Sequence, residues 1–101
     1  MNRPRRIAML LLFLMLVAGI AACERYDLEV QNKTDGVLDI YVDRYYEGSA
    51  APKNYLQVRG LSHGGHYVEA LDMDDNLIAD EDIYLDGDGK WVIYETHYRY
   101  Y

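Results

Sequence analysis

The chain has 101 residues, of which 10 are lysine or arginine and 17 are aspartate or glutamate, for a formal net charge of −7. This length fits one small domain. The excess of acid argues against nucleic acid as a partner, since the phosphate backbone is itself negative, and permits a basic partner or divalent cations. The 11 tyrosines and Trp91 are typical of half-buried rings on a small sheet, with a tyrosine-rich binding face as the alternative.

Residues 1–22 have the pattern of a secretory signal peptide, a helical leader that is cleaved after export. A basic head that contains Arg3, Arg5 and Arg6 precedes an apolar run over residues 7–20. That run is short for a membrane-spanning helix, which needs about 20 residues. The leader carries these arginines and no acid, so its removal would take the net charge from −7 to −10.

The end of this leader, Ile20-Ala21-Ala22-Cys23, resembles the lipobox of bacterial lipoproteins. The resemblance implies cleavage between Ala22 and Cys23 and a lipid on the Cys23 thiol, whose acyl chains would hold the protein at a membrane. Cys23 is the only cysteine, so no disulfide can form within the chain. In Gram-negative lipoproteins an aspartate after the cysteine favours inner-membrane retention. Glu24 stands there instead, which implies a cell-envelope protein on the outer membrane, facing the periplasm.

After a short tether at residues 23–25, a single domain is expected over residues 26–101. Apolar and polar residues alternate there with a period of two, which predicts strands. The first strand, residues 26–31, points Leu28 and Val30 to one face. A turn at residues 32–36 follows, with Asp-Gly as its strongest signal.

The clearest strand covers residues 37–45, in which inward and outward side chains alternate from residue 38 to residue 43. Leu38, Ile40 and Val42 point to one face, and Asp39, Tyr41 and Asp43 point to the other. Residues 47–52 end this strand, because Pro52 cannot donate to a central ladder. Four more strands are predicted at residues 54–59, 67–73, 77–85 and 90–95. Turns are predicted at residues 60–65, 74–76 and 86–89, and a change of phase near Leu71 indicates a β-bulge.

Short strands at this spacing predict an all-β fold, a small antiparallel β-sandwich of about six strands. Two packed layers are favoured over a single sheet, which would leave one apolar face exposed. A small closed barrel is the alternative.

Two stretches, VLDIYVDRYYEGSAAP at residues 37–52 and LSHGGHYVEALD at residues 61–72, resemble PEGA-type domains. These are small immunoglobulin-like or transthyretin-like sandwiches of bacterial surface proteins. The matching positions are Asp43, Gly48, Pro52, Leu61 and Gly64-Gly65-His66, whereas Arg44 replaces the glycine that usually follows the aspartate. The resemblance implies the fold and a role in surface binding or scaffolding, and it transfers no catalytic residue.

Acidic residues gather in the second half of the domain, where their oxygens could bind calcium. The clusters are Asp72, Asp74, Asp75 and Asn76, then Asp80, Glu81 and Asp82, then Asp86 and Asp88. None has EF-hand spacing, and Asp, Asn and Gly are also the residues that tight turns require. Calcium binding is therefore the alternative function, and no cofactor is predicted. His63 and His66, with His97 far along the chain, are weak candidates for zinc.

The sequence does not indicate an enzyme. Ser49 and Ser62 are the only serines, and neither lies in a G-x-S-x-G motif. A sandwich this small is also expected to offer little room for a cleft of ~300 Å³ or more. The tail residues Tyr98, Arg99, Tyr100 and Tyr101 are of the types enriched at binding hot spots and could contact a partner. The sequence thus predicts a lipid-anchored, non-enzymatic binding or scaffolding module for an envelope protein or glycan.

Overall fold

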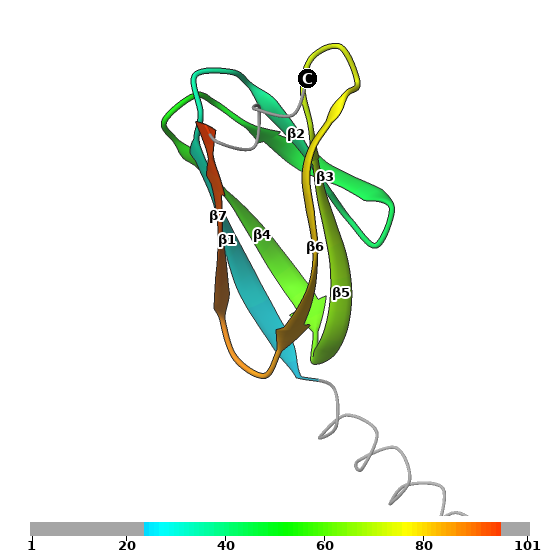
Figure 1. The fold of residues 1–101 in the computed structure, drawn as a ribbon. Helices are drawn as coiled ribbons and strands as arrows, with labels where there is room; N and C mark the ends of the chain where they lie inside the picture. Colours follow the sequence, from blue (N-terminus) through cyan, green and yellow to red (C-terminus); the bar gives the residue numbers. More distant parts are fainter. Residues whose placement is uncertain (1–23, 96–101) are drawn as a thin grey trace, which may run out of the picture.

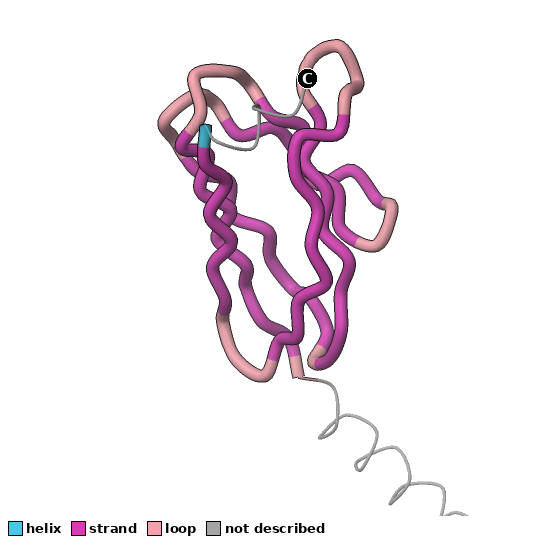
Figure 2. The backbone as a smooth tube through the Cα atoms, viewed as in Figure 1, coloured by secondary structure: helices cyan, strands magenta, loops and turns pink. Residues whose placement is uncertain are grey.

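The computed structural model describes residues 24–95. In this part of the chain the backbone forms seven strands joined by short turns (Figures 1 and 2). They are β1 (Arg25–Lys33), β2 (Leu38–Val42), β3 (Tyr45–Ala50), β4 (Tyr55–Ser62), β5 (Gly64–Leu71), β6 (Leu77–Leu85) and β7 (Gly89–Tyr94). Within residues 24–95, no helix is long and apolar enough to cross a membrane.

The strands form two sheets that enclose one core, so the predicted all-β sandwich is confirmed (Figure 1). One sheet has the strand order β4-β1-β7 and the other has the order β3-β2-β5-β6. The pairings are antiparallel except for β1 with β7, which is parallel. This departs from the purely antiparallel prediction. A parallel pair cannot be joined by a tight turn, and here the other five strands lie between its members along the chain.

Both sheets contribute side chains to the core. The three apolar side chains of β2, Leu38, Ile40 and Val42, are buried as their alternation predicted, and Leu28 and Val30 of β1 lie in the facing sheet. The rest of the core consists of Ala50, Val58, Val68, Ala70, Ile78, Ala79, Trp91 and Ile93. Full burial of one large aliphatic side chain is worth about 1.5–3 kcal/mol. This cluster is therefore the main source of stability in the described part of the chain.

The strand predicted over residues 37–45 is in fact two strands, which is why there are seven strands and not six. The chain reverses at Asp43-Arg44, where both residues have positive φ, 51° and 72°. A two-residue hairpin with positive φ at both positions matches the twist of the strands that it joins, and Val42 faces Tyr45 across it. Such turns are usually marked by glycine, and Arg44 hides this one from the sequence pattern.

Two predictions about β4 and β5 have opposite outcomes. The β-bulge predicted near Leu71 is confirmed by a register shift between Ala70 and Leu71. The loop predicted over residues 60–65 is wrong, because only His63 lies between β4 and β5. Gly60, with φ 75°, instead stands at a register shift between β4 and β1, where the bulged strand needs a residue that tolerates positive φ.

A buried polar network fastens the turn after β1 to the connection between β3 and β4. The side chains of Asn32 and Thr34 are fully buried. Asn32 Nδ2 donates to the carbonyls of Gly36, Ala50 and Ala51 at 2.7, 3.0 and 3.2 Å. Asn32 Oδ1 accepts from the backbone N–H and the hydroxyl of Thr34 at 2.9 and 2.6 Å. The network therefore holds the two connections together where the chain passes between the sheets.

Candidate functional site

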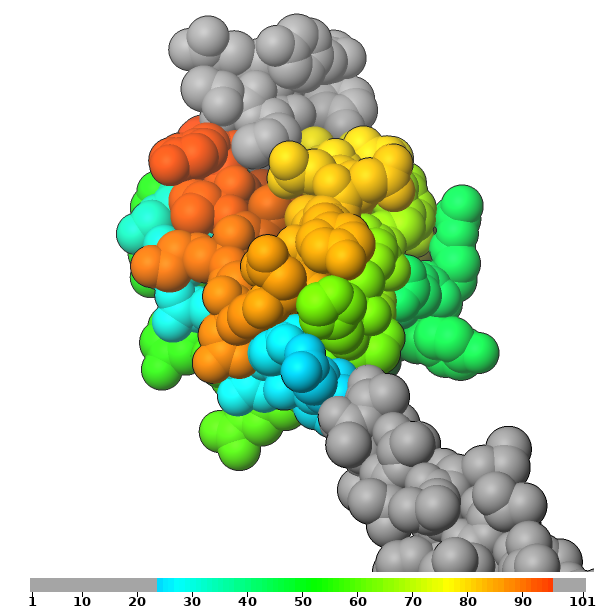
Figure 3. All heavy atoms as spheres, turned by 90° about the horizontal axis from the view of Figure 1, so that it is seen from below, coloured from blue at the N-terminus to red at the C-terminus, as the bar shows by residue number. Residues whose placement is uncertain are grey.

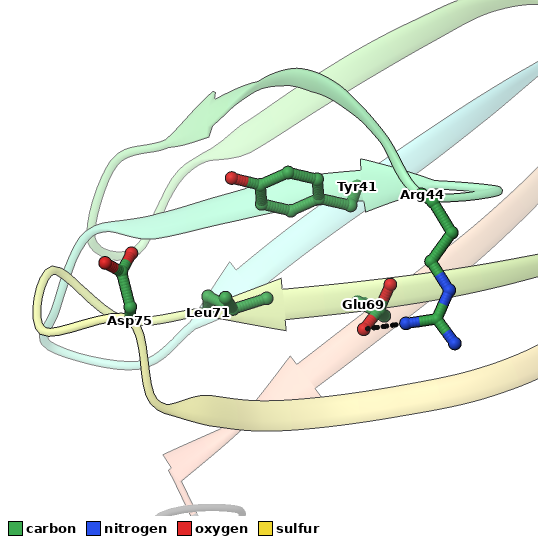
Figure 4. Close-up of a pocket in the computed structure, with 5 residues that line it drawn as sticks. All are labelled: Tyr41, Arg44, Glu69, Leu71 and Asp75. Carbon is green, nitrogen blue, oxygen red and sulfur yellow. Dashed lines mark hydrogen bonds and ion pairs between the residues drawn. The ribbon is translucent and has the colours of Figure 1, made fainter.

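A groove of about 410 Å³ lies on the outer face of the sheet β3-β2-β5-β6. Tyr41 of β2 and Leu71 of β5 lie along it, Asp75 of the β5–β6 turn stands at one end, and Arg44 and Glu69 stand at the other (Figure 4). The groove exceeds the size expected for so small a sandwich, because residues of two turns extend it beyond the strands. It is shallow and open to solvent along its length.

The strand pattern explains why these side chains point outward. The alternation that buries Ile40 and Val42 places Tyr41 on the opposite face of β2. Across the ladder, Tyr41 faces Glu69 of β5, whose neighbours Val68 and Ala70 are buried. The sequence pattern thus placed Tyr41 correctly, but it gave no signal that Arg44 would meet Glu69.

Two contacts hold Arg44 over the sheet. The Arg44 guanidinium carbon lies 5.0 Å from the centroid of the Tyr67 ring, and Nη1 lies 3.5 Å from Glu69 Oε2. The Arg44 side chain is 77 % exposed and that of Glu69 is 14 % exposed. An exposed ion pair is worth up to about 1 kcal/mol, and left-handed backbone costs a non-glycine residue about the same. Arg44 thus brings little net stability, and the hairpin that joins β2 to β3 accounts for its positive φ.

Tyrosines and hydrogen-bonded carboxylates surround the groove. The rings of Tyr41 and Tyr46 meet edge to face with centroids 5.5 Å apart. The Tyr46 hydroxyl lies 2.8 Å from Ser49 Oγ, which donates to Asp39 Oδ1 at 2.6 Å. The phenols beside the groove are therefore fixed by neighbours, which lowers the entropy that a ligand would have to remove on binding.

Tyr67 is fixed in the same way on the next strand. Its hydroxyl donates to Asp80 Oδ2 at 2.6 Å. This hydrogen bond, with partial burial and the charges of Asp80 and Glu69, raises the pKa of Tyr67 to about 12, against a smaller opposing effect of Arg44. The hydrogen bond to Asp80 fixes the Tyr67 ring, over which the Arg44 guanidinium lies.

Negative charge predominates on this face. Carboxylates of Asp39, Glu69, Asp75 and Asp80 belong to the groove or to the strands beside it. Among the described residues that line the groove, Arg44 is the basic one, and Glu69 already offsets its charge. Tyrosine rings beside an excess of carboxylates attract a cation, through the ring face and through Coulomb attraction.

The two histidines proposed as zinc ligands point to different partners. His66 is buried, with Nδ1 2.5 Å from Asp43 Oδ2 and Nε2 2.7 Å from the Ser62 carbonyl oxygen. His63 is exposed and pairs with Glu24 and the Tyr84 hydroxyl. Among residues 24–95, no three or more His, Cys, Asp or Glu side chains gather in a group that could hold a metal ion.

Asp43, His66 and Ser62 have the order of residues found in catalytic triads, which sequence reasoning missed. However, the Ser62 carbonyl can only accept, so His66 Nε2 must carry a proton and has no lone pair for the Ser62 hydroxyl, which lies 3.4 Å away. Burial lowers the pKa of His66, but its hydrogen bonds to Ser62 and Asp43 and the charge of Asp43 outweigh burial and raise it. The trio therefore serves as a charged structural clamp.

The clamp fixes the hairpin that carries Arg44. Asp43 Oδ1 also accepts from the Tyr67 backbone N–H at 2.9 Å. Burial raises the pKa of the Asp43 carboxyl, but the hydrogen bonds from Tyr67 and His66 and the charge of His66 lower it overall. Because Asp43 binds β5 through both carboxylate oxygens, the position of Arg44 over the groove follows from this pairing.

The acidic turns use their carboxylates to stabilise the backbone. Asp72 Oδ1 accepts from the backbone N–H groups of Asp74 and Asn76, each at 2.9 Å, and these bonds lower the pKa of Asp72. Asp88 Oδ1 accepts from the Asp27 backbone N–H at 2.8 Å. The bonds of Asp72 are the local ones expected when Asp supports a turn, whereas that of Asp88 ties the β6–β7 turn to β1. Asp75 is the member of the acidic clusters that reaches the groove.

The other predicted site residues lie outside residues 24–95. These are the cleavage residue Ala22, the lipid attachment residue Cys23, the histidine His97 and the tail contacts Tyr98, Arg99, Tyr100 and Tyr101. Their roles remain predictions from the sequence.

No family model matches the chain, and searches of curated proteins and of solved structures find no significant match. The resemblances to lipoproteins and to PEGA-type domains therefore stay predictions, and the site must be interpreted from its own geometry.

Proposed function

We propose that this chain is a non-enzymatic binding module of the bacterial cell envelope, anchored by lipid on Cys23 to the outer membrane and facing the periplasm. The groove along Tyr41 is its binding surface, and the partner is a positively charged segment of an envelope protein. The observation that carries this proposal is the combination, in one groove, of the Tyr41 ring, the Asp75 carboxylate and the neutralised pair Arg44–Glu69.

The choice of a basic protein segment over a glycan rests on charge. A glycan offers hydroxyl groups and would gain little from an excess of carboxylate, whereas a lysine or arginine gains from both the ring and the acid. The mature chain has a formal net charge of −10 without its basic leader, so the whole molecule would also accelerate association with a basic partner.

A photo-crosslinking amino acid at the groove tests the location of the binding surface. Placed at Tyr41 in the bacterial host, it should yield one predominant protein adduct, identified by mass spectrometry. The matched control is the same amino acid at Tyr55, an exposed tyrosine on the other sheet, where no such adduct is expected. Equal yields at both positions, or a glycan adduct at Tyr41, would contradict the proposal.

The sign of the partner's charge is tested by Arg44→Gln. This substitution removes the charge and keeps a non-glycine residue at the positive φ of position 44, so the backbone preference of the turn changes little. Removing the positive charge should strengthen binding of a basic partner. Asp75→Lys replaces an attractive charge with a repulsive one and should weaken binding by about tenfold or more, which corresponds to 1.4 kcal/mol or more. Titration calorimetry with the purified partner that the crosslinking identifies measures both effects. Weaker binding of Arg44→Gln would indicate an acidic or neutral ligand instead.

Calcium binding is the alternative function, and no observation on the described residues favours it. The melting temperature in millimolar calcium against EDTA decides it, since a ligand that binds the folded state raises that temperature.

A further inference from the structure

The end of the domain at which β1 begins carries an aromatic cluster built around Glu24. The His63 ring lies between Tyr26 and Tyr84, with centroid distances of 5.9 and 5.7 Å. His63 Nε2 is 3.2 Å from the Tyr84 hydroxyl, and Tyr84 is 67 % exposed. Seen from this end, the start of β1, the β4–β5 turn and the end of β6 lie side by side (Figure 3).

Glu24 is held on this surface through both its backbone and its side chain. Its carbonyl accepts from the His63 backbone N–H at 3.3 Å, and its carboxylate accepts from the Tyr26 hydroxyl and pairs with His63 Nδ1 at 3.4 Å. β1 begins at Arg25, so the ordered chain includes residues 24 and 25, which the sequence had assigned to a tether of residues 23–25.

One peptide unit joins Glu24 to the predicted lipid attachment residue Cys23, and consecutive Cα atoms lie about 3.8 Å apart. The polar region of a bilayer is roughly 5–8 Å thick on each side of the hydrocarbon core. An anchor at Cys23 therefore brings Tyr26, His63 and Tyr84 to the depth of the lipid headgroups. Tyrosine suits that depth, because its ring is apolar and its hydroxyl is polar.

We propose that the surface of Tyr26, His63 and Tyr84 around Glu24 contacts the zwitterionic headgroups of the membrane and holds the domain upright, with its strands directed away from the bilayer. This inference rests on the lipid attachment in the proposed function. The headgroup is assigned as zwitterionic because the Glu24 carboxylate contacts Tyr26 and His63 and Asp88 Oδ1 accepts from the Asp27 backbone N–H at 2.8 Å, next to Tyr26. Carboxylates there would repel an anionic lipid surface and pair with headgroup ammonium groups.

The upright orientation presents the groove away from the membrane. β5 begins beside this surface at Gly64 and ends in the groove at Leu71. At about 3.4 Å per residue, Leu71 lies roughly 24 Å farther along the strand. A partner could therefore reach Tyr41 and Asp75 without contacting lipid.

The experiment uses the lipidated protein, purified from its host and placed in phosphatidylcholine–phosphatidylethanolamine vesicles that contain a headgroup nitroxide lipid, a short-range quencher. Tyr84→Trp reports on the seated end. Tyr55→Trp is the matched control, an exposed tyrosine at the far end of β4, and the buried native Trp91 gives the baseline. Tyr84→Trp should lose about half of its added emission, and Tyr55→Trp should lose almost none, given their separation along the strands.

Failure of the inference is distinguishable from failure of the anchor. The mass of the purified protein, compared with that of Cys23→Ser, reports whether lipid is attached. A lipidated protein in which both tryptophans are quenched equally, or neither is, would overturn the seated orientation and leave the anchor intact. A protein without lipid would overturn both.

Discussion

Replacing Asn32 with alanine is expected to destabilise the domain by about 3–5 kcal/mol, because five hydrogen bonds end on this one buried side chain. The loss leaves the backbone N–H of Thr34 and the carbonyls of Gly36 and Ala50 without this partner inside the protein. The total stability of a domain of this size is roughly 4–10 kcal/mol. The variant should therefore unfold at a temperature lower by about 20 °C, or fail to fold.

The matched control for Asn32→Ala is Asn54→Ala, in the connection that the same network fastens. Asn54 is exposed, and its side chain accepts from the Tyr55 backbone N–H at 2.9 Å. Water can replace that bond, so a loss of about 0.5 kcal/mol is expected. Urea unfolding followed by the fluorescence of Trp91, in a soluble version that begins at Glu24, measures both. A similar small loss for the two variants would show that the buried network is dispensable.

Breaking the clamp between Asp43 and His66 has the second largest expected effect. Asp43→Ala removes the acceptor of His66 Nδ1–H and of the Tyr67 backbone N–H. Charged hydrogen bonds are worth about 1.5–3 kcal/mol, and the half-exposed Asp43 side chain lies toward the lower end, so we expect a loss of about 2 kcal/mol. Asp43→Asn keeps an acceptor and tolerates positive φ, so its loss should be smaller.

The same pair should make stability depend on pH. The pKa of His66 is raised from 6.5 in the folded state, so its contribution is complete below pH 6.5 and is lost as the pH rises through the folded value. The pKa of Asp43 is lowered from 3.8, so its contribution is complete above pH 3.8 and is lost as the pH falls through the folded value. The free energy of unfolding should therefore decline as the pH rises above 6.5.

Urea unfolding at a series of pH values from 5 to 9 measures this decline. Asp43→Asn should flatten the profile, because the carboxylate no longer favours the protonated imidazole. Asp35→Asn is the matched control, since the Asp35 side chain is mostly exposed and its carboxylate pairs with Lys53 at the surface. An unchanged decline in Asp43→Asn would mean that another group titrates, and a flat wild-type profile would contradict the charged clamp.

The sequence by itself determined the fold class and the inner faces of the strands. Strict alternation in β2 predicted that Leu38, Ile40 and Val42 are buried, and it also placed Tyr41 on the outer face. The phase change near Leu71 predicted the bulge. These features are local, because the pleat of a strand alternates side chains with a period of two whatever the strand pairs with.

Only the tertiary structure decided the reversal at Asp43-Arg44, the parallel pairing of β1 with β7 and the composition of the groove. Arg44 adopts a conformation that usually needs glycine, and it does so beside Tyr67 and Glu69, which the chain supplies from another strand. The clamp of Asp43 on His66 likewise joins residues 23 positions apart. Such contacts depend on which strands become neighbours, and the free energy of packing the whole core decides that, not any short stretch of sequence.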